Sequence, residues 1–406
     1  MAVNLRAPES LAAVAGVKLR AAATGLRYQG RDDLLLIHIA EGSNTSAVFT
    51  QNHFAAAPVR VAQSHLSTTQ PQALLINMGN ANAATGHLGE QNCIESCEYL
   101  AKHLDIDLHA VLPFSTGVIG EHLDMPKLRG AIDQLLKGNE TTDWVRAASA
   151  IMTTDTISKG GTRQFELGGK PVTITGITKG AGMIAPNMAT MLAFIATDAC
   201  IEADLLNQIL GQSVEKSFNR ISVDSDTSTN DAVTLTATGR GEARALTSFS
   251  DEHAHVFCQE LEGLMVELAT SIVRDGEGAS KFVKVEVVGG RSKANCKAVA
   301  EAVGNSPLIK TALYASDPNW GRFPMAIGKA NLDQLNPEKV DLSVNGLAIM
   351  QSGAPHPEYS EGSGQAVFAE SELCIVINLN QGNENYHIWT TDLGHDYVKI
   401  NADYRS

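Results

Sequence analysis

Lys179–Asp198 reads KGAGMIAPNMATMLAFIATD, a glycine-containing segment that runs directly into an uncharged apolar one. Glycine adopts backbone conformations that other residues avoid, so the pattern predicts a loop that leads into a buried strand. A second interpretation is chemical. If the Ala189–Thr190 bond were cut, Thr190 would carry a hydroxyl and a free α-amine, whose pKa of roughly 7.7–8.0 suits a base acting on that hydroxyl. The spacing alone favours an ordinary turn.

The composition is that of an acidic globular protein. The chain has 406 residues, of which 44% are hydrophobic and 19% charged, enough for one large or two ordinary domains. Its formal net charge of −14 argues against a nucleic-acid partner, because phosphate binding relies on clustered Lys and Arg. No export signal is visible near the start, and the uncharged stretch after Lys179 contains too many Gly, Pro, Asn and Thr residues for a membrane span. We therefore expect a cytoplasmic protein without nucleic-acid or membrane partners.

The cysteines, histidines and acidic residues give no metal-binding pattern. Cys93 and Cys97 are four residues apart and lack the paired spacing of a zinc site, while His253 and His255 have no further ligands nearby. The acidic segment 221–231 lacks the glycine and the terminal glutamate of an EF-hand loop. We expect structural thiols in a reducing compartment and no metal.

Strand-like and helix-like segments alternate without the rhythm of a parallel α/β sheet. β-favouring runs and turn residues predict strands near 34–39, 47–50, 73–76, 165–177 with a turn at Gly168-Gly169, 191–198, 283–287, 342–349 with a turn at Asn345-Gly346, 373–379 and 386–391. Helical periodicity predicts helices near 93–104, 128–135, 145–152, 205–218, 257–272 and 292–303. The mixture favours an α+β layered sandwich over a doubly wound fold.

Several segments resemble the ornithine acetyltransferase (glutamate N-acetyltransferase) family of arginine biosynthesis. The quoted stretch resembles that family's cleavage segment, and three later segments match it closely: DGEGASK at 275–281, SPLIKTA at 306–312 and DPNWGR at 317–322. The likeness extends over nearly the whole chain. It implies a helix–sheet–sheet–helix sandwich, similar to N-terminal-nucleophile hydrolases but with different connectivity.

The resemblance also implies that the chain cuts itself before Thr190. Residues 1–189 would become an α chain, and residues 190–406 a β chain that begins with the nucleophile, both contributing to one sandwich core. Cleavage would begin with attack of the Thr190 hydroxyl on the Ala189 carbonyl. An acetyl group would then pass from N2-acetylornithine to Thr190 and from there to glutamate, a double displacement with ping-pong kinetics.

The other site residues follow from the family's motifs. Thr116 and Gly117 correspond to its oxyanion hole, where a hydroxyl and a backbone N–H stabilise the negative oxygen of a tetrahedral intermediate. The resemblance implies a substrate-positioning set of Thr153, Lys179, Thr190, Glu277, Asn401 and Ser406. The acidic Glu277 suits the amino groups of ornithine. Without the family, these positions would be interpreted as turns, helix ends, a solvated charge and a frayed terminus.

Two positions depart from the family pattern. Met78 stands where the family's Asn-Ser-Gly-Asn-Ala-Asn-Ala signature has serine, so any contact made by that hydroxyl is absent. Ser225 occupies the glycine position of Val-Asp-Gly-Asp-Thr-Ser-Thr-Asn-Asp, a change that matters only if the position needs a positive φ.

Three functions stay open at this point. The acetyltransferase predicts cleavage and acetyl exchange, whereas a related self-cleaving aminopeptidase would use water in place of glutamate. A non-enzymatic phosphate-binding protein would stay uncut, although the loop lacks the Gly-Lys-Ser/Thr ending of a P-loop. The breadth of the resemblance favours the acetyltransferase. We expect no cofactor, and acetyl-coenzyme A is a second acetyl donor in some members only. The family's assemblies of paired chains imply two α plus two β chains.

Overall fold

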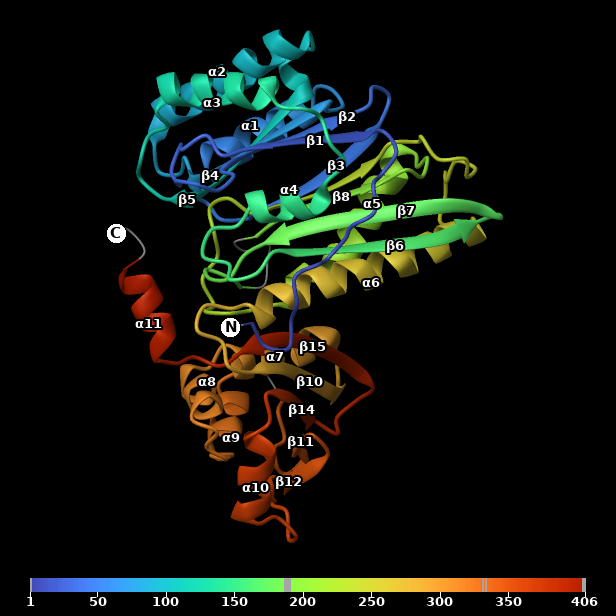
Figure 1. Ribbon diagram of the computed structural model, residues 1–406. Helices are drawn as coiled ribbons and strands as arrows, with labels where there is room; N and C mark the ends of the chain where they lie inside the picture. Colours follow the sequence, from blue (N-terminus) through green and yellow to red (C-terminus); the bar gives the residue numbers. More distant parts are fainter. Residues whose placement is uncertain (1, 186–190, 331, 333, 404–406) are drawn as a thin grey trace. The chain divides into compact units, whose positions relative to one another are not determined.

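The computed structural model describes residues 2–185, 191–330, 332 and 334–403, which fold into two compact units (Figure 1). The larger unit comprises Arg6–Asn219 and Asp226–Ile272, and the smaller unit comprises Met1–Leu5, Arg220–Ser225 and Val273–Ser406. Each unit has its own apolar core. Within the described ranges, no helix is both long enough and apolar enough to cross a membrane.

The larger unit contains two sheets. The first sheet has the order β1-β2-β4-β5, and its β4–β5 pair is parallel. Its strands are β1 (Val17–Ala22), β2 (Leu34–Ile39), β4 (Ala73–Asn80) and β5 (Val111–Val118). The second sheet has the order β3-β9-β8-β7-β6, and its β8–β9 pair is parallel. Its strands are β3 (Asn44–Phe49), β6 (Lys159–Leu167), β7 (Lys170–Lys179), β8 (Leu192–Thr197) and β9 (Ala232–Ala237).

Helices cover the outer faces of both sheets (Figure 1): α1 (Ala57–Leu66), α2 (Gly86–Leu104) and α3 (Met125–Lys137) on the first, and α5 (Ala203–Lys216) and α6 (Glu252–Arg274) on the second. Helix α4 (Trp144–Ala150) lies between the two sheets, and its Trp144, Ala147 and Ala148 side chains belong to their shared core. Alternation along β2 directs Leu34 and Leu36 toward the α1–α3 side and Leu35 and Ile37 into the core shared with the second sheet. Phe194 of β8 lies in that shared core. This helix–sheet–sheet–helix order confirms the predicted α+β layered sandwich.

The smaller unit contains a third sheet, with the order β13-β12-β11-β14-β10-β15 and a parallel β10–β14 pair. Its strands are β10 (Phe282–Gly290), β11 (Asp341–Val344), β12 (Leu347–Gln351), β13 (Ala354–Pro355), β14 (Glu372–Asn378) and β15 (Glu384–Thr391). Its helices are α7 (Lys293–Gly304), α8 (Pro307–Tyr314), α9 (Arg322–Gly328), α10 (Glu361–Phe368) and α11 (His395–Ala402). Val283 and Val285 of β10 pack with Val299 and Val303 of α7, as their alternation and periodicity predict.

The predicted turns are confirmed, and several predicted boundaries are wrong. Gly168-Gly169 joins β6 to β7, and Asn345-Gly346 joins β11 to β12. The predicted strand 73–76 continues to Asn80, because Asn77 to Asn80 pair with the parallel strand β5. Helix α2 begins at Gly86, well before the predicted start at 93.

The two departures from the family pattern have different structural consequences. The Met78 side chain is buried in the core between the two sheets of the larger unit, and its backbone N–H donates to the Asp33 carbonyl at 3.0 Å. A thioether at this position therefore contributes apolar packing. Ser225 has φ = +71°, the left-handed conformation that glycine adopts with less strain.

Replacing Ser225 with Gly should raise the free energy of unfolding by about 1 kcal/mol, because glycine relieves the left-handed strain. Urea unfolding of the two proteins measures the difference. The exposed Ser371 is a suitable control because its φ is not positive. Ser371→Gly should not raise the free energy of unfolding. If the Ser225→Gly protein is no more stable than the parent, the inference of backbone strain at Ser225 is wrong.

Candidate active site

The predicted oxyanion-hole residues lie where β5 runs beside β4. Thr116 pairs with Met78, and Gly117 pairs with Gly79. Gly117 has φ = +136°, and a Cβ added to it would lie 2.1 Å from the Gly79 carbonyl carbon. Only glycine fits this close approach of two backbones. The pairing holds the Gly117 backbone in one conformation, as a preorganised N–H donor requires.

Lys179 brings a positive charge to this strand end. It is the last residue of β7 and pairs with Leu192, the first residue of β8. Its side chain is buried, and its Nζ lies 3.4 Å from Thr116 Oγ1. Lys179 is therefore not the solvated loop charge of the alternative interpretation, but a buried cation beside the predicted oxyanion-hole hydroxyl.

Asp155 connects three segments around Lys179. Its Oδ1 accepts hydrogen bonds from Lys159 Nζ at 2.6 Å and from the Gly180 N–H at 2.7 Å. Its Oδ2 accepts a hydrogen bond from the Thr153 N–H at 2.9 Å. One carboxylate thus fixes the backbone of Thr153, the start of β6 and the first residue after β7.

The charge of Asp155 is maintained by its neighbours. Burial alone raises the pKa of Asp155, but the charges of Lys159 and Lys179 and the hydrogen bonds from Lys159 and Gly180 outweigh that effect and hold the pKa well below its ordinary value. The Asp155 and Lys159 side chains are both fully buried. Around the ionised Asp155 the larger unit therefore gathers two lysines, an arrangement that favours a bound or developing negative charge.

Asn230 and Asp231, directly before β9, link the two strands on either side. The Asn230 side-chain amide donates to the carbonyls of Ala81 at 2.7 Å and Ser115 at 2.9 Å. Asp231 Oδ1 accepts a hydrogen bond from the Met191 N–H at 2.7 Å. Strand β5, which carries Thr116, and the residue directly before strand β8 are therefore both hydrogen-bonded to the adjacent residues Asn230 and Asp231.

The smaller unit brings Glu277 and Asn401 together. Asn401 of α11 donates its side-chain N–H to Glu277 Oε2 at 2.7 Å and to the Tyr397 carbonyl at 3.0 Å. Gly278 has φ = +72°, and a Cβ there would lie 2.6 Å from the Tyr397 nitrogen, so the loop that carries Glu277 packs closely on α11. In this arrangement the carboxylate can accept hydrogen bonds from an ammonium group, and the amide N–H can donate to an acceptor beside it.

The predicted site residues fall into three sets. The larger unit holds Thr116, Gly117, Thr153 and Lys179, and the smaller unit holds Glu277 and Asn401. Ala189, Thr190 and Ser406 lie outside the described residues. The sequence pattern did not single out Asp155, Lys159, Asn230 or Asp231 as site residues. Asp155 and Asp231 each lie in a segment rich in hydroxyl residues that precedes a strand, and this pattern is the feature of the sequence that could have indicated them.

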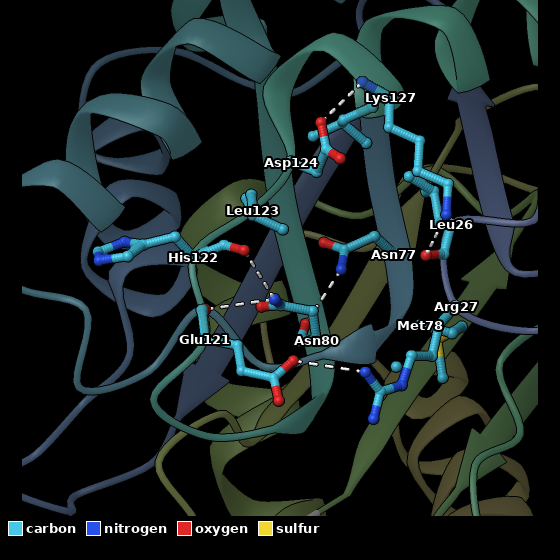
Figure 2. Close-up of a pocket in the computed structure, with 12 residues that line it drawn as sticks. Leu26, Arg27, Asn77, Met78, Asn80, Glu121, His122, Leu123, Asp124 and Lys127 are labelled. Carbon is cyan, nitrogen blue, oxygen red and sulfur yellow. Dashed lines mark hydrogen bonds and ion pairs between the residues drawn. The ribbon is translucent and has the colours of Figure 1, made fainter.

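A separate pocket of about 170 Å³ lies against the end of β4 (Figure 2). Its lining includes Met78 and Asn80 but none of the predicted site residues. The Asn80 amide donates to the carbonyls of Glu121 and His122, and Arg27 pairs with the Glu121 carboxylate at 3.4 Å. Because these polar groups already satisfy one another, we assign the pocket no role in the chemistry. In the part of the chain that the structure describes, no three His, Cys, Asp or Glu residues are placed to hold a metal ion.

Replacing Asp155 with Asn should lower the free energy of unfolding by about 3–5 kcal/mol at neutral pH, because the change leaves buried lysines without their counter-charge. The pKa of Asp155 is lower in the folded protein, so its ionised form stabilises the fold above the unfolded-state pKa of about 3.9, and this contribution is lost as the pH falls below that value. The difference in the free energy of unfolding between the parent and the Asp155→Asn protein, measured by urea unfolding at several pH values, should therefore become smaller in acid.

The exposed pair Lys170–Glu242, 2.9 Å apart, is a matched control for this measurement. Glu242→Gln removes a carboxylate from an ion pair in solvent and should change stability little at any pH. An Asp155→Asn protein that is as stable as the Glu242→Gln protein would show that the buried carboxylate does not hold the site together.

Comparisons with known proteins show which family this chain matches. Residues 18–406 match the model of the ArgJ family. The chain is 46% identical over 406 residues to the arginine biosynthesis bifunctional protein ArgJ of Pseudomonas syringae pv. tomato, with 100% of both chains covered. It is also 46% identical over 403 residues to the protein of the same name from Psychrobacter arcticus, with 99% of each covered.

The solved structure of the arginine biosynthesis bifunctional protein argJ from Bacillus halodurans is 36% identical in the matched part. The match covers 50% of this chain and 95% of that one, with a TM-score of 0.48. The family match and the full-length relatives lead to one conclusion: the chain belongs to the ArgJ family.

Proposed function

We propose that the chain is a self-cleaving glutamate N-acetyltransferase of arginine biosynthesis. It passes an acetyl group from N2-acetylornithine to glutamate through an ester on Thr190. The observation that carries the proposal is the buried contact of Lys179 with the Thr116 hydroxyl, organised by Asp155. Full-length relatives at 46% identity that are named for arginine biosynthesis support the pathway.

Cleavage comes first in this proposal. The Thr190 hydroxyl attacks the Ala189 carbonyl, the Oγ–C bond forms, and the C–N bond breaks. The Thr190 nitrogen takes up the proton lost by the hydroxyl and is a free amine from this step on. Water then hydrolyses the ester, which separates residues 1–189 from 190–406. Hydrogen bonds flank the segment that contains this bond: the Gly180 N–H is held by Asp155, and the Met191 N–H is held by Asp231.

Acetyl transfer uses the same hydroxyl. The Thr190 amine takes the hydroxyl proton as the oxygen attacks the acetyl carbonyl of acetylornithine, and ornithine leaves with a proton. The amine of glutamate then attacks the Thr190 ester. The oxyanion of each tetrahedral intermediate binds the Thr116 hydroxyl and the Gly117 N–H, and the nearby Lys179 ammonium adds electrostatic stabilisation.

Recognition of the amino acid falls to charged and polar side chains. Lys179 and the Thr153 segment suit a substrate carboxylate, since Asp155 alone does not balance the two buried lysines. Glu277, paired with Asn401, suits the ammonium of ornithine, and Ser406 belongs to the same proposed set. An aminopeptidase would not need both a carboxylate and an ammonium partner, and the full-length relatives are not named as peptidases.

The relatives' description as bifunctional supports a second acetyl donor, for which we propose acetyl-coenzyme A. We further propose an assembly of two α and two β chains that works in the cytoplasm. The six cysteines are free thiols, as a reducing compartment allows.

Replacing Thr190 with Ala should abolish both cleavage and transfer, because the hydroxyl is the nucleophile of each. On a denaturing gel the parent protein should give two fragments and the variant one uncut chain. Two fragments from the Thr190→Ala protein would exclude Thr190 as the cleavage nucleophile.

Mass spectrometry of the parent protein after incubation with acetylornithine extends the same test. An acetyl adduct should appear on the fragment that begins at Thr190, and glutamate should remove it. Acetyl-coenzyme A in place of acetylornithine should give the same adduct if it is a second donor. Free acetate without transfer to glutamate would favour the hydrolase instead.

Replacing Glu277 with Gln should lower kcat/KM for acetylornithine about tenfold to a hundredfold, because a charge-assisted hydrogen bond of about 1.5–3 kcal/mol is lost. Cleavage should proceed normally, because the cleavage chemistry involves no substrate ammonium. Glu286→Gln, which removes a carboxylate 3.0 Å from Lys284 on β10, is the control and should leave kcat/KM unchanged. Equal kinetics for the two variants would remove Glu277 from the binding set.

A further inference from the structure

Arg31 is a charged residue of the larger unit that contacts the proposed binding set and has no role in the chemistry described so far. It lies in the segment between β1 and β2. Its Nη2 donates a hydrogen bond to the Met152 carbonyl at 3.1 Å. Met152 directly precedes Thr153, which belongs to the proposed substrate-binding set.

The Met152 contact reaches Thr153 through a single peptide group. The peptide bond between these residues is trans, so the Met152 carbonyl and the Thr153 N–H point to opposite sides of one plane. Asp155 Oδ2 accepts a hydrogen bond from that N–H at 2.9 Å. Arg31 therefore holds one edge of the peptide group and Asp155 holds the other. Two side chains from different segments thus fix the direction in which the backbone enters Thr153.

Tyr28 orients the guanidinium group of Arg31. The central carbon of the guanidinium lies 3.6 Å from the centre of the Tyr28 ring, a stacked cation–π contact. A planar guanidinium on an aromatic face presents its N–H donors in one plane, which the round ammonium of lysine cannot do. The stacking therefore limits the directions in which Nη2 can donate.

The two residues after Arg31 anchor the same segment. Asp32 accepts hydrogen bonds from Arg146 of α4, from its Nε at 2.7 Å and from its Nη2 at 3.0 Å. Asp33 is fully buried and accepts the N–H of Thr24 at 2.8 Å and its hydroxyl at 2.7 Å. The segment before β2 is thus bound to α4 itself and to the chain that follows α4.

Resting on the proposed function, we propose that Arg31 is a positioning residue for substrate recognition. It acts through the Met152–Thr153 peptide and keeps Thr153 in the conformation that meets the carboxylate of the amino-acid substrate. A binding group held in place before the substrate arrives loses less conformational freedom on binding, so less of the interaction free energy is spent on ordering it.

A purely structural role of Arg31 makes a different prediction. Helix α4 ends at Ala150, and a cation that donates to carbonyls near a helix C-terminus stabilises the helix. If this were the only role, the loss of Arg31 would lower stability, and any effect on substrate binding would be independent of the Thr153 hydroxyl. Positioning predicts instead that the effect on substrate binding depends on that hydroxyl.

The test is a double-mutant cycle on acetyl transfer from acetylornithine to glutamate by the purified full chain. Arg31→Met removes the guanidinium and keeps a long side chain, and Thr153→Ala removes the hydroxyl. Each single change should raise KM for acetylornithine about tenfold with little change in kcat, because a binding interaction is lost equally in the ground and transition states. The double variant should have no higher KM than Thr153→Ala, because Arg31 then has no hydroxyl to position.

An unchanged KM in Arg31→Met would overturn the proposal. So would additive effects, about a hundredfold in total, in the double variant. Arg240 offers a matched control, because its Nη2 donates to the Glu41 carbonyl at 2.7 Å on the exposed surface of the same unit. Arg240→Met breaks the same kind of contact and should leave KM and kcat unchanged. An equal rise of KM in Arg240→Met would also overturn the role of Arg31.

The parent protein shows which claim fails. If the parent transfers no acetyl group, the proposed function fails and the role of Arg31 falls with it. If the parent transfers acetyl and the cycle is additive, only the role of Arg31 fails. Should Arg31→Met not unfold cooperatively on heating, Arg31→Lys takes its place in the cycle, since lysine keeps a donor but not the planar group on Tyr28. A rise in KM that disappears in the Thr153→Ala background supports the proposal, and any other result overturns it.

Discussion

The pairing of one ionised carboxylate, Asp155, with its buried partners is the constraint on which the candidate site of the larger unit depends. Removing a carboxylate from water costs several kcal/mol unless charges and hydrogen bonds replace the lost hydration. Lys159 and the N–H groups of Thr153 and Gly180 supply that replacement. These partners come from three separate stretches, so satisfying one side chain fixes the backbone around Lys179. The electrostatics and the geometry of the site therefore have the same origin.

The smaller unit orders its binding loop by a similar device. Asp392 is buried and accepts hydrogen bonds from the backbone N–H groups of Ser280 at 2.9 Å and Lys281 at 3.0 Å, at the end of the loop that carries Glu277. Lys310 is also buried, and its Nζ donates to Thr390 Oγ1 at 2.7 Å. Burial lowers the pKa of Lys310 to about 7, against the opposing charge of Asp392. In both units an inward-facing carboxylate thus gathers backbone donors next to a residue of the proposed binding set, Lys179 in the larger unit and Glu277 in the smaller one.

Local chemistry made part of this structure predictable from the sequence, and long-range pairing made the rest unpredictable. The turns at Gly168-Gly169 and Asn345-Gly346 need positive φ, which their residues supply without help from the fold. The parallel pairs β4–β5 and β8–β9 join strands separated by a helix, so no local pattern revealed them. The motifs located Thr116 and Lys179 separately. Their contact, and the role of Asp155 in it, exists only after the two sheets stack.

Two buried aspartates of the larger unit show that burial alone does not set the direction of a pKa shift. At Asp231 burial raises the pKa well above its ordinary value, because the Met191 N–H and the charge of Lys179 oppose it only in part. At Asp155 the charges of Lys159 and Lys179 and the hydrogen bonds from Lys159 and Gly180 outweigh burial and lower the pKa. A buried carboxylate keeps its charge where neighbouring cations and donors replace the lost water. The lysines therefore stabilise the Asp155 carboxylate, and the carboxylate in turn fixes the backbone beside Lys179.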